Sequence, residues 1–102
     1  MRYNLIKYHL TNGNPDEWNR EVASFVKAID EDPSLRGKIA YRALRTEGGD
    51  YYHLAVSVDE TATKELVSRD FFKQYAEKVE KASAGGVEVL PLEVVAQTAP
   101  QP

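Results

Sequence analysis

The stretch Tyr51-Tyr52-His53-Leu54-Ala55-Val56-Ser57-Val58 lies between the turn residues Gly48-Gly49-Asp50 and the polar segment Asp59-Glu60-Thr61. Aromatic and β-branched residues bounded in this way predict a β-strand. Alternate side chains of a strand point to opposite faces, so one row is Tyr52, Leu54, Val56 and Val58, and the other is Tyr51, His53, Ala55 and Ser57. We expect helices to cover the first, more apolar row. The second row then needs another cover or a ligand.

The clearest helix is predicted to begin after Asn14, which can cap it, with Pro15 in its first position. Asp32-Pro33 ends this helix, because the residue before a proline avoids the helical conformation. Its apolar residues recur at helical spacing on one face, namely Trp18, Val22, Phe25, Val26 and Ile29.

A second helical region is predicted in two pieces, over 61–67 and, capped by Ser68, over 69–83. Gly85-Gly86 stops it, because glycine adopts the left-handed backbone that ends helices. The buried side chains of this region are expected to be Leu66, Phe72, Tyr75, Val79 and Ala82.

Three more strands are predicted, over 2–10, 38–47 and 87–96. The Gly48-Gly49 turn joins the strand 38–47 to the Tyr51 strand as a hairpin, and Pro91 marks an edge position or a bulge. The order β-α-β-β-α-β predicts an α+β, ferredoxin-like domain, a four-stranded antiparallel sheet with two helices on one face. We expect one domain over 1–97 and a flexible tail over 98–102.

Composition excludes several classes of site. The 102 residues include no cysteine, so disulfides and thiol chemistry are excluded. The net charge of −3 argues against nucleic acid as a partner, since phosphate binding needs unopposed basic residues. No apolar run approaches the roughly twenty residues of a membrane span. The N-terminus lacks the apolar core of a secretion signal. We therefore expect a cytoplasmic protein that binds no membrane.

The sheet face opposite the helices is predicted to be partly apolar, with Leu5, Lys7, His9, Tyr41, Tyr51, His53 and Ala55 on it. So much apolar surface is seldom left in water. A second copy of the sheet, a nucleic acid or a small molecule could cover it. RNA is disfavoured, because the aromatic motif of RNA-recognition domains is absent and Asp50 adjoins the supposed stacking surface.

In element order and length the chain resembles the dimeric α+β barrel superfamily, and within it the antibiotic biosynthesis monooxygenase-like proteins. The most family-like segment is Leu66-Val67-Ser68-Arg69-Asp70-Phe71-Phe72-Lys73-Gln74-Tyr75. The resemblance implies a homodimer that pairs two sheets face to face. It also implies activities such as cofactor-free oxygenation of polyketide-type aromatics, or haem degradation.

Haem degradation can be tested residue by residue against this resemblance. The haem-degrading branch has an asparagine on its first strand, a tryptophan before the second helix and a haem-ligating histidine within that helix. The matching positions are occupied by Ile6, Glu65 and Ala76. Ligation of haem iron by a histidine of that helix is therefore excluded, and we expect no cofactor.

His53 is the leading catalytic candidate, because a near-neutral imidazole beside phenols can move a proton to or from a phenol or enol. Tyr51 and Tyr41 are its expected helpers. The alternative interpretation is that His53 only makes hydrogen bonds across the dimer interface. No histidine spacing typical of a metal site is present, so no metal site is predicted.

A ligand pocket between sheet and helices is the second hypothesis. Its aromatic wall would consist of Tyr8, Tyr52, Phe72 and Tyr75, which would suit a flat aromatic ligand; ordinary core packing is the alternative. Two functions therefore stay open. One is a cofactor-independent oxygenase, an oxidoreductase of an aromatic or enolic compound. The other is a non-catalytic ligand-binding or structural homodimer.

Overall fold

The computed structural model describes residues 1–99. Within them the predicted order is confirmed, with the second helical region divided in two. The elements are β1 (Arg2–His9), α1 (Pro15–Glu31), β2 (Ile39–Arg45), β3 (Asp50–Ser57), α2 (Glu60–Ser68), α3 (Asp70–Ala82) and β4 (Glu88–Leu92). The predicted tail falls largely on residues 100–102, outside the described part of the chain.

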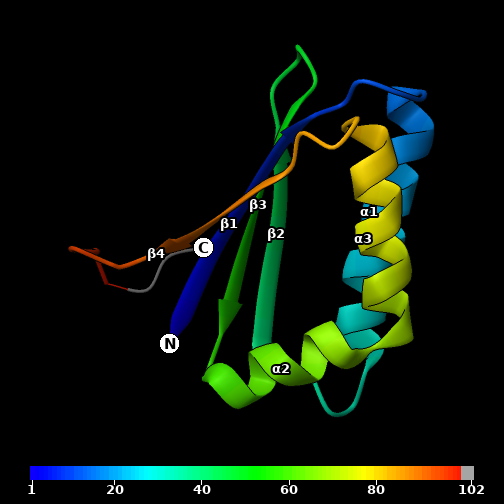
Figure 1. Cartoon of the computed structure of the whole chain (residues 1–102). Helices are drawn as coiled ribbons and strands as arrows, with labels where there is room; N and C mark the ends of the chain where they lie inside the picture. The colour runs from blue at the N-terminus through cyan, green and yellow to red at the C-terminus, as the bar shows by residue number, and fades with distance from the viewer. Residues whose placement is uncertain (100–102) are drawn as a thin grey trace.

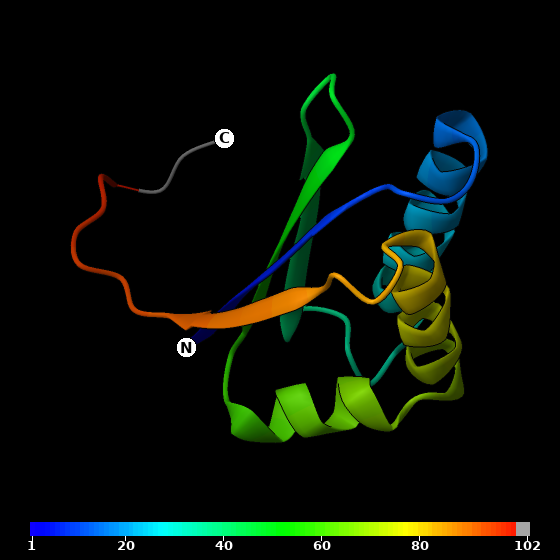
Figure 2. The ribbon, with the colours of Figure 1, turned by 45° about the horizontal axis from the view of Figure 1, so that its top comes forward.

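The four strands form one antiparallel sheet in the order β2-β3-β1-β4. Helices α1 and α3 lie side by side over one face of this sheet, and α2 runs across one end of it (Figure 1). Figure 2 shows that β4 and the segment after it extend away from the helices. Strand β4 is an edge strand, which is where Pro91, with no N–H to donate, can be accommodated.

Helix α1 begins as predicted. The Asn14 side-chain oxygen accepts hydrogen bonds from the backbone N–H groups of Asp16 at 2.9 Å and Glu17 at 3.2 Å, which satisfies donors that the helix leaves free. Its apolar face packs on α3, where the rings of Phe25 and Tyr75 stack 3.9 Å apart. The buried residues of α1 are Trp18, Val22, Phe25 and Ile29.

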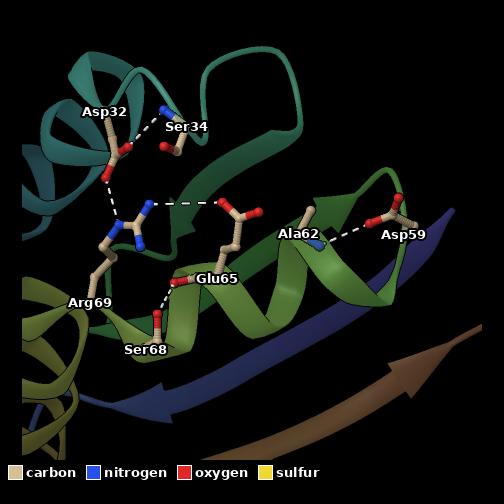
Figure 3. A network of polar contacts seen from close by, with 7 residues as sticks. All are labelled: Asp32, Ser34, Asp59, Ala62, Glu65, Ser68 and Arg69. Atoms are coloured by element: carbon tan, nitrogen blue, oxygen red, sulfur yellow. Dashed lines mark hydrogen bonds and ion pairs between the residues drawn. The ribbon is translucent and has the colours of Figure 1, made fainter.

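The junction of α2 and α3 differs from its prediction. Ser68 does not cap α3, because its hydroxyl donates to the Glu65 carbonyl 2.7 Å away. The break is made by Arg69, whose backbone is extended at φ −70° and ψ 140°. The Arg69 Nε donates to a carboxylate oxygen of Asp32 at 2.9 Å (Figure 3). This bond ties the junction to the residue that follows α1.

The predicted faces of β2 and β3 are wrong. His53 lies opposite Ile6 and Ala43, and its side chain is fully buried beneath the helices, whereas Tyr52 is 39% exposed on the other face. The row that faces the helices includes Tyr41, Tyr51, His53 and Ala55. Both rows of β3 are apolar enough to be buried, so alternation alone did not decide between them. Mutual hydrogen bonds among the buried polar side chains offset the cost of burying them.

The face of the sheet that no helix covers is called the open face below. Leu5, Lys7 and His9 lie on it, as predicted. In cross-strand register its side chains are Tyr3, Leu5, Lys7, His9, Ala40, Arg42, Leu44, Asp50, Tyr52, Leu54, Val56, Glu88, Leu90 and Leu92. Several large apolar residues among them are more than a third exposed, which is unusual for a surface that water alone covers.

Candidate functional site

His53 lies at the centre of a cluster of hydrogen-bonded phenols between the sheet and the helices. Its Nε2 is 3.0 Å from the Tyr8 hydroxyl, and its Nδ1 is 2.8 Å from the Tyr41 hydroxyl. The Tyr75 hydroxyl lies at 3.5 Å from the same Nδ1. The cluster thus draws one side chain each from β1, β2, β3 and α3, and the strand register brings the first three together.

Further contacts hold this cluster in place. The Trp18 indole N–H donates to the Tyr8 hydroxyl at 3.0 Å. The rings of Tyr8 and Tyr41 meet the imidazole edge-on, with centroids 5.2 and 5.5 Å away, an arrangement favoured between aromatic rings. Trp18, predicted from its spacing to belong to the core, is buried as expected.

Burial keeps the cluster uncharged near neutral pH. It lowers the pKa of His53 from 6.5 to about 4, because the imidazolium loses its hydration. The same cause raises the pKa of Tyr8 to about 12 and the pKa values of the Tyr41 and Tyr75 hydroxyls still further. A neutral imidazole has one donor and one acceptor nitrogen, and each phenol can both donate and accept. The cluster can therefore pass a proton along its hydrogen bonds.

A cavity of about 410 Å³ adjoins this cluster, between the sheet and helices α2 and α3. The hydroxyl-bearing side chains of Tyr41 and Tyr75 line it, whereas His53 reaches it only through them. Its other lining residues are largely apolar and include Ile6, Ala55, Leu66, Phe72, Val79 and Val87. Such a site, apolar with a few polar groups, suits a small organic molecule.

The structure brings some of the predicted site residues to this cavity and places others elsewhere. Phe72 and Tyr75 line it, and Tyr8 lies behind it against His53. Tyr52 faces away, on the open face. The Tyr51 hydroxyl donates to the Asn19 side chain and not to His53. Of the two expected helpers of His53, Tyr41 alone makes a hydrogen bond to it.

The sequence analysis missed the polar residues of the cavity wall other than the tyrosines, namely Asn4, Ser57, Thr63 and Glu80. A signal was present for Asn4. It shares its side of β1 with Ile6 and Tyr8, so it is a polar residue on an otherwise apolar row. Ser57 follows His53 and Ala55 on their side of β3, but that row was assigned to the open face.

A wider groove of about 930 Å³ lies between α1 and β2. Tyr41 and Tyr51 contribute to it, and its other lining residues combine apolar side chains, such as Val22 and Ile39, with the charged side chains of Lys27, Asp30, Arg42 and Arg45. The cavity beneath α2 and α3 is less open, and it has the more apolar wall and the hydroxyls bonded to His53. It is therefore the better candidate for a small aromatic ligand.

Within residues 1–99 no group of three or more His, Asp or Glu side chains is arranged to hold a metal ion. No helix in this part of the chain is long and apolar enough to cross a membrane.

Comparison with known proteins identifies the fold. No protein-family model matches the sequence, and the curated proteins yield no significant match. Solved structures match over nearly the whole chain. SnoaB, a cofactor-independent oxygenase from Streptomyces nogalater, is 18% identical, with 98% of each chain covered and a TM-score of 0.72.

Two further structures lead to the same conclusion. An antibiotic biosynthesis monooxygenase-like protein from Deinococcus radiodurans is 8% identical over the full length of both chains, with a TM-score of 0.78. Another from Caulobacter crescentus is 17% identical, with 93% of this chain and 90% of that chain covered and a TM-score of 0.76. The resemblance predicted from the sequence is thus confirmed at the level of the fold.

Proposed function

We propose that this chain, which has the fold of the antibiotic biosynthesis monooxygenase-like proteins, is a cofactor-independent oxygenase of an aromatic or enolic compound. The observation that carries the proposal is that two tyrosines belong both to the cavity wall and to the phenol cluster around His53. Tyr41 and Tyr75 line an apolar cavity and also lie within hydrogen-bond distance of His53. The solved structure of SnoaB, a cofactor-independent oxygenase of the same fold, supports it.

In this mechanism His53 is the base and Tyr41 transmits the proton. A substrate in the cavity gives a proton to the Tyr41 oxygen as the Tyr41 hydroxyl gives its own proton to Nδ1 of His53. The products are a substrate anion, an imidazolium and an unchanged phenol. The Tyr41 and Tyr75 hydroxyls can then donate to the developing oxyanion, which a preorganised site stabilises more effectively than water.

The low pKa of His53 is compatible with this role. A substrate with a pKa of about 10 is roughly six units less acidic than an imidazolium of pKa about 4, so the transfer costs roughly 8 kcal/mol. A turnover of about 10 per second corresponds to a barrier of about 16 kcal/mol. The transfer therefore fits within the barrier, and attraction between imidazolium and anion lowers its cost further.

The substrate anion then reacts with molecular oxygen, which is the oxidant. For a methylene beside an aromatic ketone, the carbanion transfers an electron to oxygen, and the resulting radicals combine to a peroxide. The imidazolium returns its proton through Tyr41 to the peroxide anion, and loss of water from the resulting hydroperoxide leaves a carbonyl. One oxygen atom is incorporated, and the other leaves in water with the two hydrogens of the methylene.

Homodimerisation through the open face is part of the proposal. Leu44, Tyr52, Leu90 and Leu92 are between 38% and 54% exposed there. Arg42 on β2 and Glu88 on β4 stand near opposite edges of this face, so a two-fold axis running along the strands would bring these unlike charges near each other. A second copy of the sheet would remove the apolar surface from water.

Oxygen uptake with anthrone, an aromatic ketone with an enolic tautomer, tests the oxygenase. The assay contains EDTA and no added flavin. Under these conditions we expect the protein to consume oxygen faster than buffer alone does, with one O2 molecule consumed per anthrone. Tyr41→Phe and His53→Gln should each lower the rate by about 100-fold or more, and Tyr51→Phe should not. Binding without any acceleration would instead support a non-catalytic ligand-binding protein, which the fully enclosed His53 also favours.

A further inference from the structure

The cavity has polar side chains at a second position, away from the phenol cluster. Within residues 1–99 neither the Asn4 amide nor the Ser57 hydroxyl has a hydrogen-bond partner, although both residues line the cavity. Ser57 is only 3% exposed. Every fully enclosed side-chain nitrogen or oxygen in this part of the chain does have a partner. The unpaired Ser57 hydroxyl is therefore open to the cavity.

The strand register places these two residues across the cavity floor from the phenols. Asn4 on β1 and Tyr41 on β2 both lie opposite Ala55 of β3, so their backbones are about 10 Å apart, at two strand spacings. Ser57 is two residues beyond Ala55 on the same face, in the direction away from His53. The small Ala55 side chain leaves room between the two groups of polar atoms.

The chemistry of the two side chains defines what they can bind. An amide and a hydroxyl each donate and accept, and burying them without partners is unfavourable unless a ligand supplies the partner. The one charged side chain among the described lining residues of this cavity is the carboxylate of Glu80, and no Lys or Arg lines it. A neutral oxygen, in a carbonyl or a phenolic hydroxyl, therefore fits better than a carboxylate or a phosphate.

We propose that Asn4 and Ser57 form a second hydrogen-bonding subsite, which binds a neutral oxygen of the ligand while Tyr41 and Tyr75 bind another. This inference rests on the proposed function and adds a second point of substrate recognition to it. The subsite selects a ligand that carries neutral oxygen functions at two separated positions, such as a dihydroxyarene.

Calorimetric titration with two probes of the same ring system tests the subsite. 2-Naphthol carries one hydroxyl, and 2,6-dihydroxynaphthalene carries one at each end. We expect the native protein to bind the second probe about tenfold more tightly, the effect of one additional well-made hydrogen bond. Ser57→Ala and Asn4→Leu should each reduce this preference several-fold and leave the affinity for 2-naphthol nearly unchanged.

Thr63→Val is the matched control, because Thr63 also lines the cavity but its hydroxyl donates to the Asp59 carbonyl at 3.3 Å. Its preference should equal that of the native protein. Ser57→Ala removes one atom and decides the question even if Asn4→Leu folds poorly. An unchanged preference in Ser57→Ala would overturn the subsite but leave the proposed function in place. Failure of the native protein to bind either probe would count against both.

Discussion

The Tyr41 hydroxyl lies 2.8 Å from Nδ1 of His53, and the Tyr41 side chain also forms part of the cavity wall. A fully buried histidine is thereby connected to the space where a ligand can bind. Tyr41→Phe leaves Nδ1 with only the longer contact to Tyr75 at 3.5 Å. We expect it to lower the free energy of unfolding by roughly 1–3 kcal/mol, the cost of a buried unpaired group.

Urea denaturation measures this loss, and the anthrone assay measures the accompanying loss of oxygen uptake. Tyr51→Phe is the matched control, because the Tyr51 hydroxyl bonds Asn19 and does not contact His53. It should lose some stability and keep its rate. Equal loss of rate in both variants would show that the Tyr41 hydroxyl has no special role.

Acid should destabilise the fold through His53. The pKa of this residue falls from 6.5 to about 4 on burial, so between these values the unfolded chain binds a proton that the native state does not. The contribution is complete above pH 6.5, decreases as pH falls toward 4 and levels off below it. It amounts to roughly 3 kcal/mol.

Urea denaturation at several pH values between 4 and 7 measures how the free energy of unfolding changes with pH. His53→Gln provides the comparison, because glutamine does not titrate. Asp32 also loses stabilising contacts on protonation, since the hydrogen bond from Arg69 lowers the pKa of its carboxyl. That contribution is common to both proteins. The difference between them isolates His53, and parallel pH profiles would show that His53 is not buried as described.

Filling the cavity should abolish ligand binding. Ala55 lies between Asn4 and Tyr41 on the cavity floor, so Ala55→Leu places a larger side chain where the ligand would lie. We expect binding of 2-naphthol to weaken at least about tenfold, with a stability change below the roughly 1–3 kcal/mol typical of overpacked cores. Ala23→Leu, the same change in the wider groove between α1 and β2, is the control and should leave binding unchanged. Undiminished binding in Ala55→Leu would place the ligand elsewhere.

The Asp32–Arg69 bond should control the mobility of one cavity wall. It joins the α2–α3 junction to the end of α1 (Figure 3), and Leu66 and Val67 of α2 line the cavity. Asp32→Asn removes the charge of the partner of Arg69. We expect faster amide hydrogen exchange in α2 and unchanged exchange in β1 and β3. Glu21→Gln, which weakens the more exposed bond to Lys78, should leave exchange in α2 as it is.

The order of elements and the N-terminus of α1 could be predicted from the sequence because local signals determine them. Asn14 and Pro15 specify a helix start whatever the tertiary structure, and the edge position of Pro91 follows from its missing donor. Ser68 shows the limit of this reasoning. Its hydroxyl can cap the helix that follows or donate to a carbonyl of the helix that precedes, and it does the latter. The extended backbone at Arg69, whose side chain bonds Asp32, determines where α3 begins.

The orientation of β3 could not be predicted in the same way. Tyr51 and His53 look more polar than Tyr52 and Leu54, so they were expected away from the helices. Three tyrosines from other elements supply hydrogen bonds to His53, and no local pattern reveals such partners. The same error concealed Ser57. Correct placement of the His53 row requires the pairing of β3 with β1, a contact between residues far apart in sequence.

Mapping the binding site of 2,6-dihydroxynaphthalene by amide chemical-shift changes in a nitrogen-15 NMR titration is the most direct test of the account. The central claim is that the ligand binds between the sheet and helices α2 and α3. It predicts the largest shifts at Asn4, Ala55, Ser57, Phe72 and Ala76, all of which line the cavity. Shifts concentrated on Arg42, Tyr52 and Leu90 of the open face, with the cavity residues unchanged, would contradict it.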